Sequence, residues 1–130
     1  MTELNHLAVA VATVTAFLLS AVWYMAFGAR LARLSDAYAS AERPPAWTAV
    51  AELGRGALVA TVLAWLAGEV GVDGWPRALG LACVLWVGFP VVLLAGSVLH
   101  ERVPWRLAAV HAGDWLLKLA VIAVIVGTWK

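Results

Sequence analysis

The sequence predicts an all-α, polytopic membrane protein with four transmembrane helices in a single domain, residues 1–130. Two features of composition support this prediction. Hydrophobic residues make up 64% of the 130 positions and charged residues only 13%, against about 45–50% and about 25% in an average soluble domain. The mean hydropathy is +0.89. A chain of this size cannot bury that much apolar surface in a soluble core, and it is too hydrophobic to be disordered.

The third observation is four apolar stretches, each long enough to cross a membrane, which takes about 20 residues. They span residues 4–29, 46–68, 78–99 and 107–129. The first and third carry no charged residue. The second contains Glu52 and Arg55, and the fourth contains Asp114 and Lys118. None of the four alternates with the period of two that is typical of strands.

The first stretch is interpreted as a retained helix and not as a cleaved signal peptide, because Glu3 precedes it and no Lys or Arg does. After it, residues 30–40 alternate basic and apolar side chains. This pattern fits either a short amphipathic helix on the membrane surface or a solvated linker.

Prolines mark the starts of the later helices, where a missing N–H costs nothing. Pro44 and Pro45 precede the second stretch, Pro76 the third and Pro104 the fourth. Pro90 lies within the third stretch and predicts a kink there, because it removes one backbone hydrogen bond.

The distribution of Lys and Arg predicts the orientation. Five basic residues lie in the loops after the first and third stretches, and two lie on the opposite side. Because cytoplasmic loops carry the excess of positive charge, we expect both termini outside and a multi-pass protein of the plasma (inner) membrane. The five are Arg30, Arg33, Arg43, Arg102 and Arg106, and the two are Arg77 and Lys130.

Aromatic rings fit this orientation, since Trp and Tyr favour the headgroup level. Trp23, Tyr24 and Trp105 fall near the predicted cytoplasmic interface. Trp86 and Trp115 lie deeper and are expected to pack between helices or to face lipid.

Small residues recur every four positions on the first two stretches. Such a pattern lets two helices approach closely in a membrane, either within one chain or between copies. The expected partners are therefore membrane lipid and either further copies of this chain (a homo-oligomer) or a partner membrane protein. The residues are Ala8, Ala12, Ala16 and Ser20 on the first stretch, and Gly56, Ala60, Ala64 and Gly68 on the second.

A polar cluster inside the membrane is the candidate functional site, because charges there are costly. Glu52 and Arg55 share one face of their helix. His111, Asp114 and Lys118 lie within an arc of about 60° on theirs. The two sets lie at similar depths, which predicts that the faces meet, with Glu52 paired to Lys118 and Asp114 paired to Arg55.

Three functions are compatible with this cluster. The first is a channel- or carrier-like protein with a polar pathway, because Asp, Glu and His chains mark such routes. The second is a non-catalytic structural or accessory subunit whose charges only hold helices together. The third is an enzyme acting on lipid at the cytoplasmic interface, which is the least favoured.

No chemistry beyond the cluster is indicated by the sequence. The chain contains no HExxH, CxxC, phosphate-binding loop or dinucleotide fingerprint. We therefore expect no catalytic residues, no metal site and no cofactor. A net charge of +1 gives no sign of nucleic-acid binding, and the single Cys83 excludes an intrachain disulfide.

Short motifs along nearly the whole chain resemble domain-of-unknown-function family 1761, small membrane proteins of bacteria and archaea. The matching positions are Asn5, Trp23-Tyr24, Phe27-Gly28, Arg30, Gly88-Phe89, Glu101-Arg102, Pro104-Trp105 and Ala112-Gly113. The chain departs from the family pattern at Met25-Ala26, where the family often has Ser-Pro, and at His111, where Asn is expected. The resemblance implies a four-helix membrane protein and implies no activity.

Overall fold

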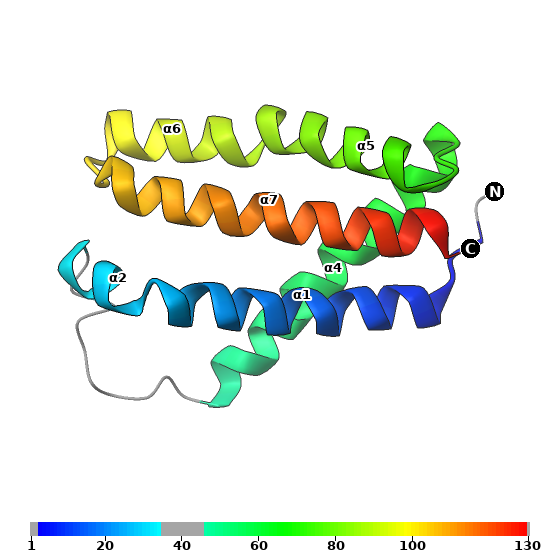
Figure 1. Cartoon of the computed structure of the whole chain (residues 1–130), viewed down its shortest axis with the longest axis horizontal. Coiled ribbons are helices and arrows are strands. Elements are labelled where there is room, and N and C mark those ends of the chain that lie inside the picture. The colour runs from blue at the N-terminus through cyan, green and yellow to red at the C-terminus, as the bar shows by residue number, and fades with distance from the viewer. Residues whose placement is uncertain (1–2, 35–45, 130) are drawn as a thin grey trace.

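The computed structural model describes residues 3–34 and 46–129, and every regular element in these ranges is a helix (Figure 1). The helices are α1 (His6–Ala26), α2 (Gly28–Leu34), α4 (Ala46–Val70), α5 (Trp75–Gly88), α6 (Pro90–His100) and α7 (Trp105–Thr128). Within the described residues, four helical segments are long and apolar enough to cross a membrane: α1, α4, α5 with α6, and α7. The four predicted spans therefore agree with the helices to within a few residues.

Helix α1 begins where Asn5 caps it. The Asn5 side chain accepts a hydrogen bond from the Ala8 amide at 3.0 Å, which satisfies one of the free N–H groups at the helix start. The same side chain donates to the Trp129 carbonyl at 3.4 Å. Asn5 thus joins the start of α1 to the end of α7, and both lie at the same end of the bundle (Figure 1).

The third span is interrupted at Phe89, so the kink predicted at Pro90 is present as a break between α5 and α6. Phe89 departs from helical geometry, with φ −122° and ψ −74°. Its amide still bonds to the Leu85 carbonyl, and its own carbonyl accepts from Leu93. Pro90 supplies no N–H, so the chain bends here while its backbone bonds otherwise continue.

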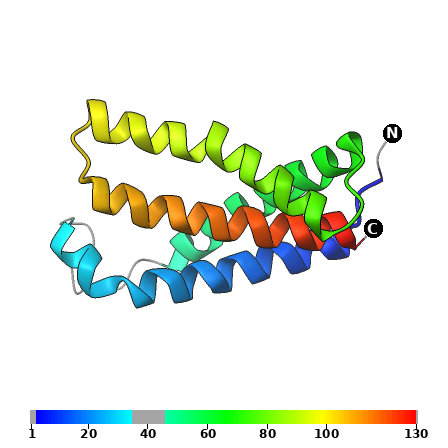
Figure 2. The same ribbon diagram turned by 45° about the horizontal axis from the view of Figure 1, so that its top comes forward.

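Helix α7 is the centre of the bundle. It contacts α1, α2, α4, α5 and α6, and it runs antiparallel to α1 and to the α5–α6 span (Figures 1 and 2). Helix α4 runs in the same general direction as α7 but crosses α1 and α7 obliquely. One half of α4 therefore packs in the bundle, while its N-terminal half diverges from it.

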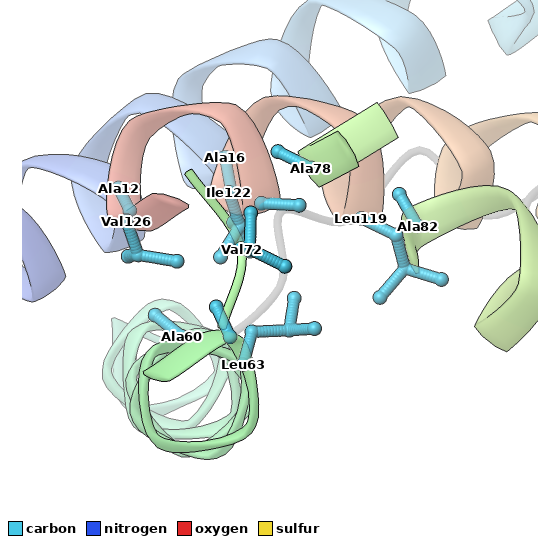
Figure 3. Close-up of a cluster of buried hydrophobic side chains, with 12 residues drawn as sticks. Ala12, Ala16, Ala60, Leu63, Val72, Ala78, Ala82, Leu119, Ile122 and Val126 are labelled. Carbon is cyan, nitrogen blue, oxygen red and sulfur yellow. The ribbon is translucent and has the colours of Figure 1, made fainter. Parts of the chain in front are cut away.

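The hydrophobic core lies where α4 closes on the other helices (Figure 3). The buried residues of α4 are Ala60, Leu63 and Ala67, all in its C-terminal half. They pack with alanines of α1 and α5 and with larger side chains of α7 such as Ile122. Small side chains on α1, α4 and α5 let these helices approach α7 closely, as expected for packing within a membrane.

The outer surfaces of the helices are apolar. On α1, six large hydrophobic side chains follow one another at helical spacing and are all exposed: Leu7, Val11, Val14, Leu18, Val22 and Met25. Such a surface suits hydrocarbon and not water. The exposed faces and the four long helices together indicate a membrane protein.

The predicted surface segment at residues 30–40 lies only partly within the described residues. Its first positions belong to α2, which ends at Leu34. Arg43, Pro44 and Pro45 lie outside the described residues, and α4 begins directly after them at Ala46.

Candidate functional site

A cavity of about 500 Å³ lies between α1, α4 and α7, and we call it the polar cavity. It is partly open to the outside and combines charged with apolar walls. Its lining includes all five residues of the predicted polar cluster. The lining residues are Thr13, Ala16, Phe17, Ser20, Ala21, Tyr24, Glu52, Arg55, Gly56, Val59, His111, Asp114, Trp115, Lys118 and Ile122.

The oblique path of α4 opens this cavity. Along its C-terminal half, α4 packs against α1 and α7, and toward Ala46 it moves away from them (Figure 1). Gly56 lies near the point of divergence, where an added Cβ would be 3.6 Å from Cγ2 of Thr13. Glu52 and Arg55 precede this point on α4, and both line the cavity.

Asp114 is the buried centre of the site, with a relative exposure of 1%. Its Oδ1 accepts a hydrogen bond of 2.6 Å from the Ser20 hydroxyl of α1. Its Oδ2 forms an ion pair with Lys118 Nζ at 2.9 Å. Each carboxylate oxygen therefore has a partner, which a charge removed from water requires.

Lys118 completes this arrangement one helical turn after Asp114. Its side chain is 17% exposed, and its Nζ lies 4.8 Å from the centre of the Trp115 ring. An ammonium group over an indole face is stabilised by a cation–π interaction. Lys118 thus has an anion and an aromatic face as partners while it still borders the cavity.

The predicted pairing between helices is wrong. Glu52 forms an ion pair with Arg55 on α4, and Asp114 pairs with Lys118 on α7. Residues three or four apart on one helix are neighbours, so each charge finds a partner without a second helix. The divergence of α4 then leaves the two pairs facing one cavity instead of each other.

Tyr24 and His111 form a second polar contact at the cavity wall. The Tyr24 hydroxyl lies 2.6 Å from Nδ1 of His111, and the two ring centres are 5.6 Å apart. Tyr24 was expected as an interface aromatic residue and not as part of the cluster. The sequence could have identified Tyr24 by its position one turn after Ser20 on α1, since residues four apart share a helix face.

Two tryptophans donate hydrogen bonds to the backbone of α7 just before Asp114. Trp23 Nε1 of α1 donates to the Val110 carbonyl at 3.0 Å, and Trp86 Nε1 of α5 donates to the Ala112 carbonyl at 2.8 Å. Trp23 was predicted at the membrane interface, and in the structure its ring packs against Gly113. Indole N–H groups inside a membrane need such partners, so both rings fix the turn that carries Asp114.

The small residues predicted to pack are placed as follows. Ala8, Ala12 and Ala16 are buried, as is Ala60, whereas Ser20 bonds to Asp114. Ala64 and Gly68 border a smaller hollow of about 210 Å³ together with Asn5 and Ala8. The stripe on α1 and the later residues of the stripe on α4 therefore lie between helices of one chain.

The described residues contain no group of three or more His, Cys, Asp and Glu side chains placed to hold a metal ion. The polar cavity instead offers two carboxylates, two cations, an imidazole and three hydroxyls. Chemically, this set can bind a small charged or hydrogen-bonding solute, or exchange protons.

The model of a protein family described as "Protein of unknown function (DUF1761)" matches residues 7–127 of the chain. The chain belongs to the DUF1761 family. No curated protein and no solved structure matches it. The resemblance drawn from the short motifs is therefore confirmed over nearly the whole chain.

The motif positions that resemble DUF1761 lie at junctions of this fold. Gly88 and Phe89 form the break between α5 and α6, and Glu101 caps the end of α6. Pro104 and Trp105 begin α7. Together with Asn5 at the start of α1 and the contact between Trp23 and Gly113, they set helix ends and helix contacts in this DUF1761 protein.

Proposed function

We propose that this DUF1761 protein is a channel- or carrier-like membrane protein whose polar cavity forms part of a pathway for protons or a small charged solute. One observation carries the proposal. All five residues of the predicted polar cluster line a single, partly open cavity of about 500 Å³. Ionisable residues that face a cavity within a membrane mark such pathways.

The arrangement within the cavity supports transfer along α7. His111 contacts Tyr24 at one level, and Asp114 with Lys118 lies one turn further along the same helix. These side chains can give up or accept protons while each keeps a polar partner. The Glu52–Arg55 pair is the more exposed of the two ion pairs, and so it lies at the open side.

The proposal includes the orientation in the membrane. The arginines after α1 and before α7 favour that end of the bundle in the cytoplasm, with both termini outside in a plasma (inner) membrane. Self-association of the chain would enclose the open side of the cavity and belongs to the same proposal.

A proton-flux measurement tests the pathway. The protein is reconstituted into liposomes that contain a pH-sensitive dye, and a potassium diffusion potential drives proton entry. We expect flux above that of empty liposomes, and we expect His111→Gln to reduce it to the background of empty liposomes. His100→Gln is the matched control, because His100 is exposed at the end of α6 and lies outside the cavity. Equal flux in protein-containing and empty liposomes contradicts a proton pathway.

The structural or accessory role is the second candidate, and a separate observation favours it. Within the described residues, no buried side-chain nitrogen or oxygen lacks a hydrogen-bond partner. Asp114 in particular uses both carboxylate oxygens. A fully satisfied polar cluster can simply hold α1 and α7 in register. This role predicts a stable protein without flux.

A further inference from the structure

We propose that a second cavity, separate from the polar cavity, binds the phosphate group of an anionic phospholipid. This cavity measures about 690 Å³ and lies where α2 and the end of α1 meet the start of α7. We call it the arginine pocket, because Arg30, Arg33 and Arg106 line it.

The charge of the arginine pocket suits a phosphate group. Three guanidinium groups from α2 and α7 border it, and no Asp or Glu is among the lining residues within the described part of the chain. Within the described residues, none of the three arginines forms an ion pair with a carboxylate. Guanidinium groups bind phosphate through paired, charge-assisted hydrogen bonds, so the pocket has an excess of the appropriate donors.

Aromatic rings place these arginines. The Arg30 guanidinium lies 5.9 Å from the centre of the Phe27 ring, and the Arg106 guanidinium lies 5.5 Å from that of Trp105. Both rings line the pocket too. A guanidinium that stacks on an aromatic face keeps the N–H groups in its own plane free to contact a ligand. Buried Leu31 holds α2 in place between the two arginines that this helix contributes.

The position in the bundle favours a lipid as the source of the phosphate. The pocket lies beside the last turn of α1 and the first turns of α7, from Trp105 to Gly113, at the end of the bundle opposite the termini (Figure 2). Headgroups lie at this level when the helices cross a membrane. Apolar walls such as Leu34 and Val110 accompany the arginines, and these suit the glycerol and upper acyl region of a lipid. Basic pockets between transmembrane helices bind anionic headgroups in this way.

The arginine pocket is independent of the proposed pathway. Trp23 and Gly113 line the arginine pocket, whereas Tyr24 and Asp114 line the polar cavity. Among the described residues the two cavities share no lining residue, so binding in one can be measured without activity in the other.

Lipid binding to the full chain in detergent tests the proposal. The probes are phosphatidylglycerol, phosphatidylcholine and inorganic phosphate, and native mass spectrometry reports the bound fraction. We expect preferential binding of phosphatidylglycerol and a loss of roughly 25-fold in its affinity for Arg30→Gln/Arg106→Gln, at about fivefold per arginine. Arg30→Lys/Arg106→Lys, which keeps the charge, should lose less.

The matched control is Arg77→Gln/Arg102→Gln, which removes two exposed arginines that do not line the pocket. It should bind phosphatidylglycerol as the unmodified protein does. An unchanged unfolding temperature without lipid shows that the variants fold. Equal binding of both phospholipids overturns the proposal. So does a loss of phosphatidylglycerol affinity in Arg77→Gln/Arg102→Gln that equals the loss in Arg30→Gln/Arg106→Gln. Inorganic phosphate that binds as tightly as phosphatidylglycerol overturns a lipid as the source.

Discussion

Replacing Gly113 by alanine is expected to destabilise the protein strongly, although it adds only one methyl group. The added Cβ would lie 2.5 Å from Cζ2 and 2.8 Å from Cη2 of Trp23. The indole ring cannot move freely, because its Nε1 donates to the Val110 carbonyl. Overpacking of this kind costs about 1–3 kcal/mol. The thermal unfolding temperature of the purified protein in detergent should fall accordingly.

The matched control is Gly80→Ala on α5, because no atom lies within 4 Å of a Cβ added there. Alanine favours a helix over glycine, so this variant should be as stable as the unmodified protein or more so. Trp23→Phe shortens the ring and should recover part of the stability lost in Gly113→Ala. Additive losses in the double variant contradict the contact between these two residues.

The second large effect is expected at Asp114. Asn in its place can still accept from Ser20, but the Lys118 ammonium loses its anionic partner in a largely buried position. Removing one partner of a buried ion pair costs about 3–5 kcal/mol. We therefore expect Asp114→Asn to lower the unfolding midpoint well beyond an ordinary surface substitution.

Two further variants identify the unpaired charge as the cause. Asp114→Asn/Lys118→Met removes both charges, and it should recover most of the lost stability because an uncharged pair needs no counterion. Glu52→Gln breaks the exposed pair with Arg55 and should cost no more than about 1 kcal/mol. A double variant less stable than Asp114→Asn alone shows that Lys118 does not depend on Asp114.

The sequence was sufficient to predict the four helices and the candidate site as a group. Hydropathy and length define the spans, and the few charges within them identify positions that share a face, such as His111, Asp114 and Lys118. These properties depend on helix periodicity alone. Periodicity is visible in one sequence, and so the helices and the residues that share a helix face could be predicted.

Contacts between helices could not be predicted from the sequence in the same way. Pairing Glu52 with Lys118 assumed that α4 stays beside α7 along its whole length, whereas its N-terminal half diverges. The roles of Trp23 and Tyr24 likewise depend on which face of α1 meets α7. Crossing angles arise from side-chain packing between helices, which hydropathy does not encode.

The central claim is that the polar cavity forms part of a pathway, which requires water to reach it, and cysteine accessibility tests this requirement most directly. In a Cys83→Ala background, Val59→Cys places a thiol in the cavity wall, about 20 Å from the start of α4. Leu58→Cys is the matched control at the same depth, because Leu58 is 67% exposed on the outer surface and does not line the cavity. The measurement is the rate of modification by a charged methanethiosulfonate reagent in liposomes.

We predict that Val59→Cys reacts at least about tenfold faster than Leu58→Cys, because the reactive thiolate forms in water and not in hydrocarbon. Protection of both thiols, or equal reaction of the two, would contradict a water-filled cavity between α1, α4 and α7.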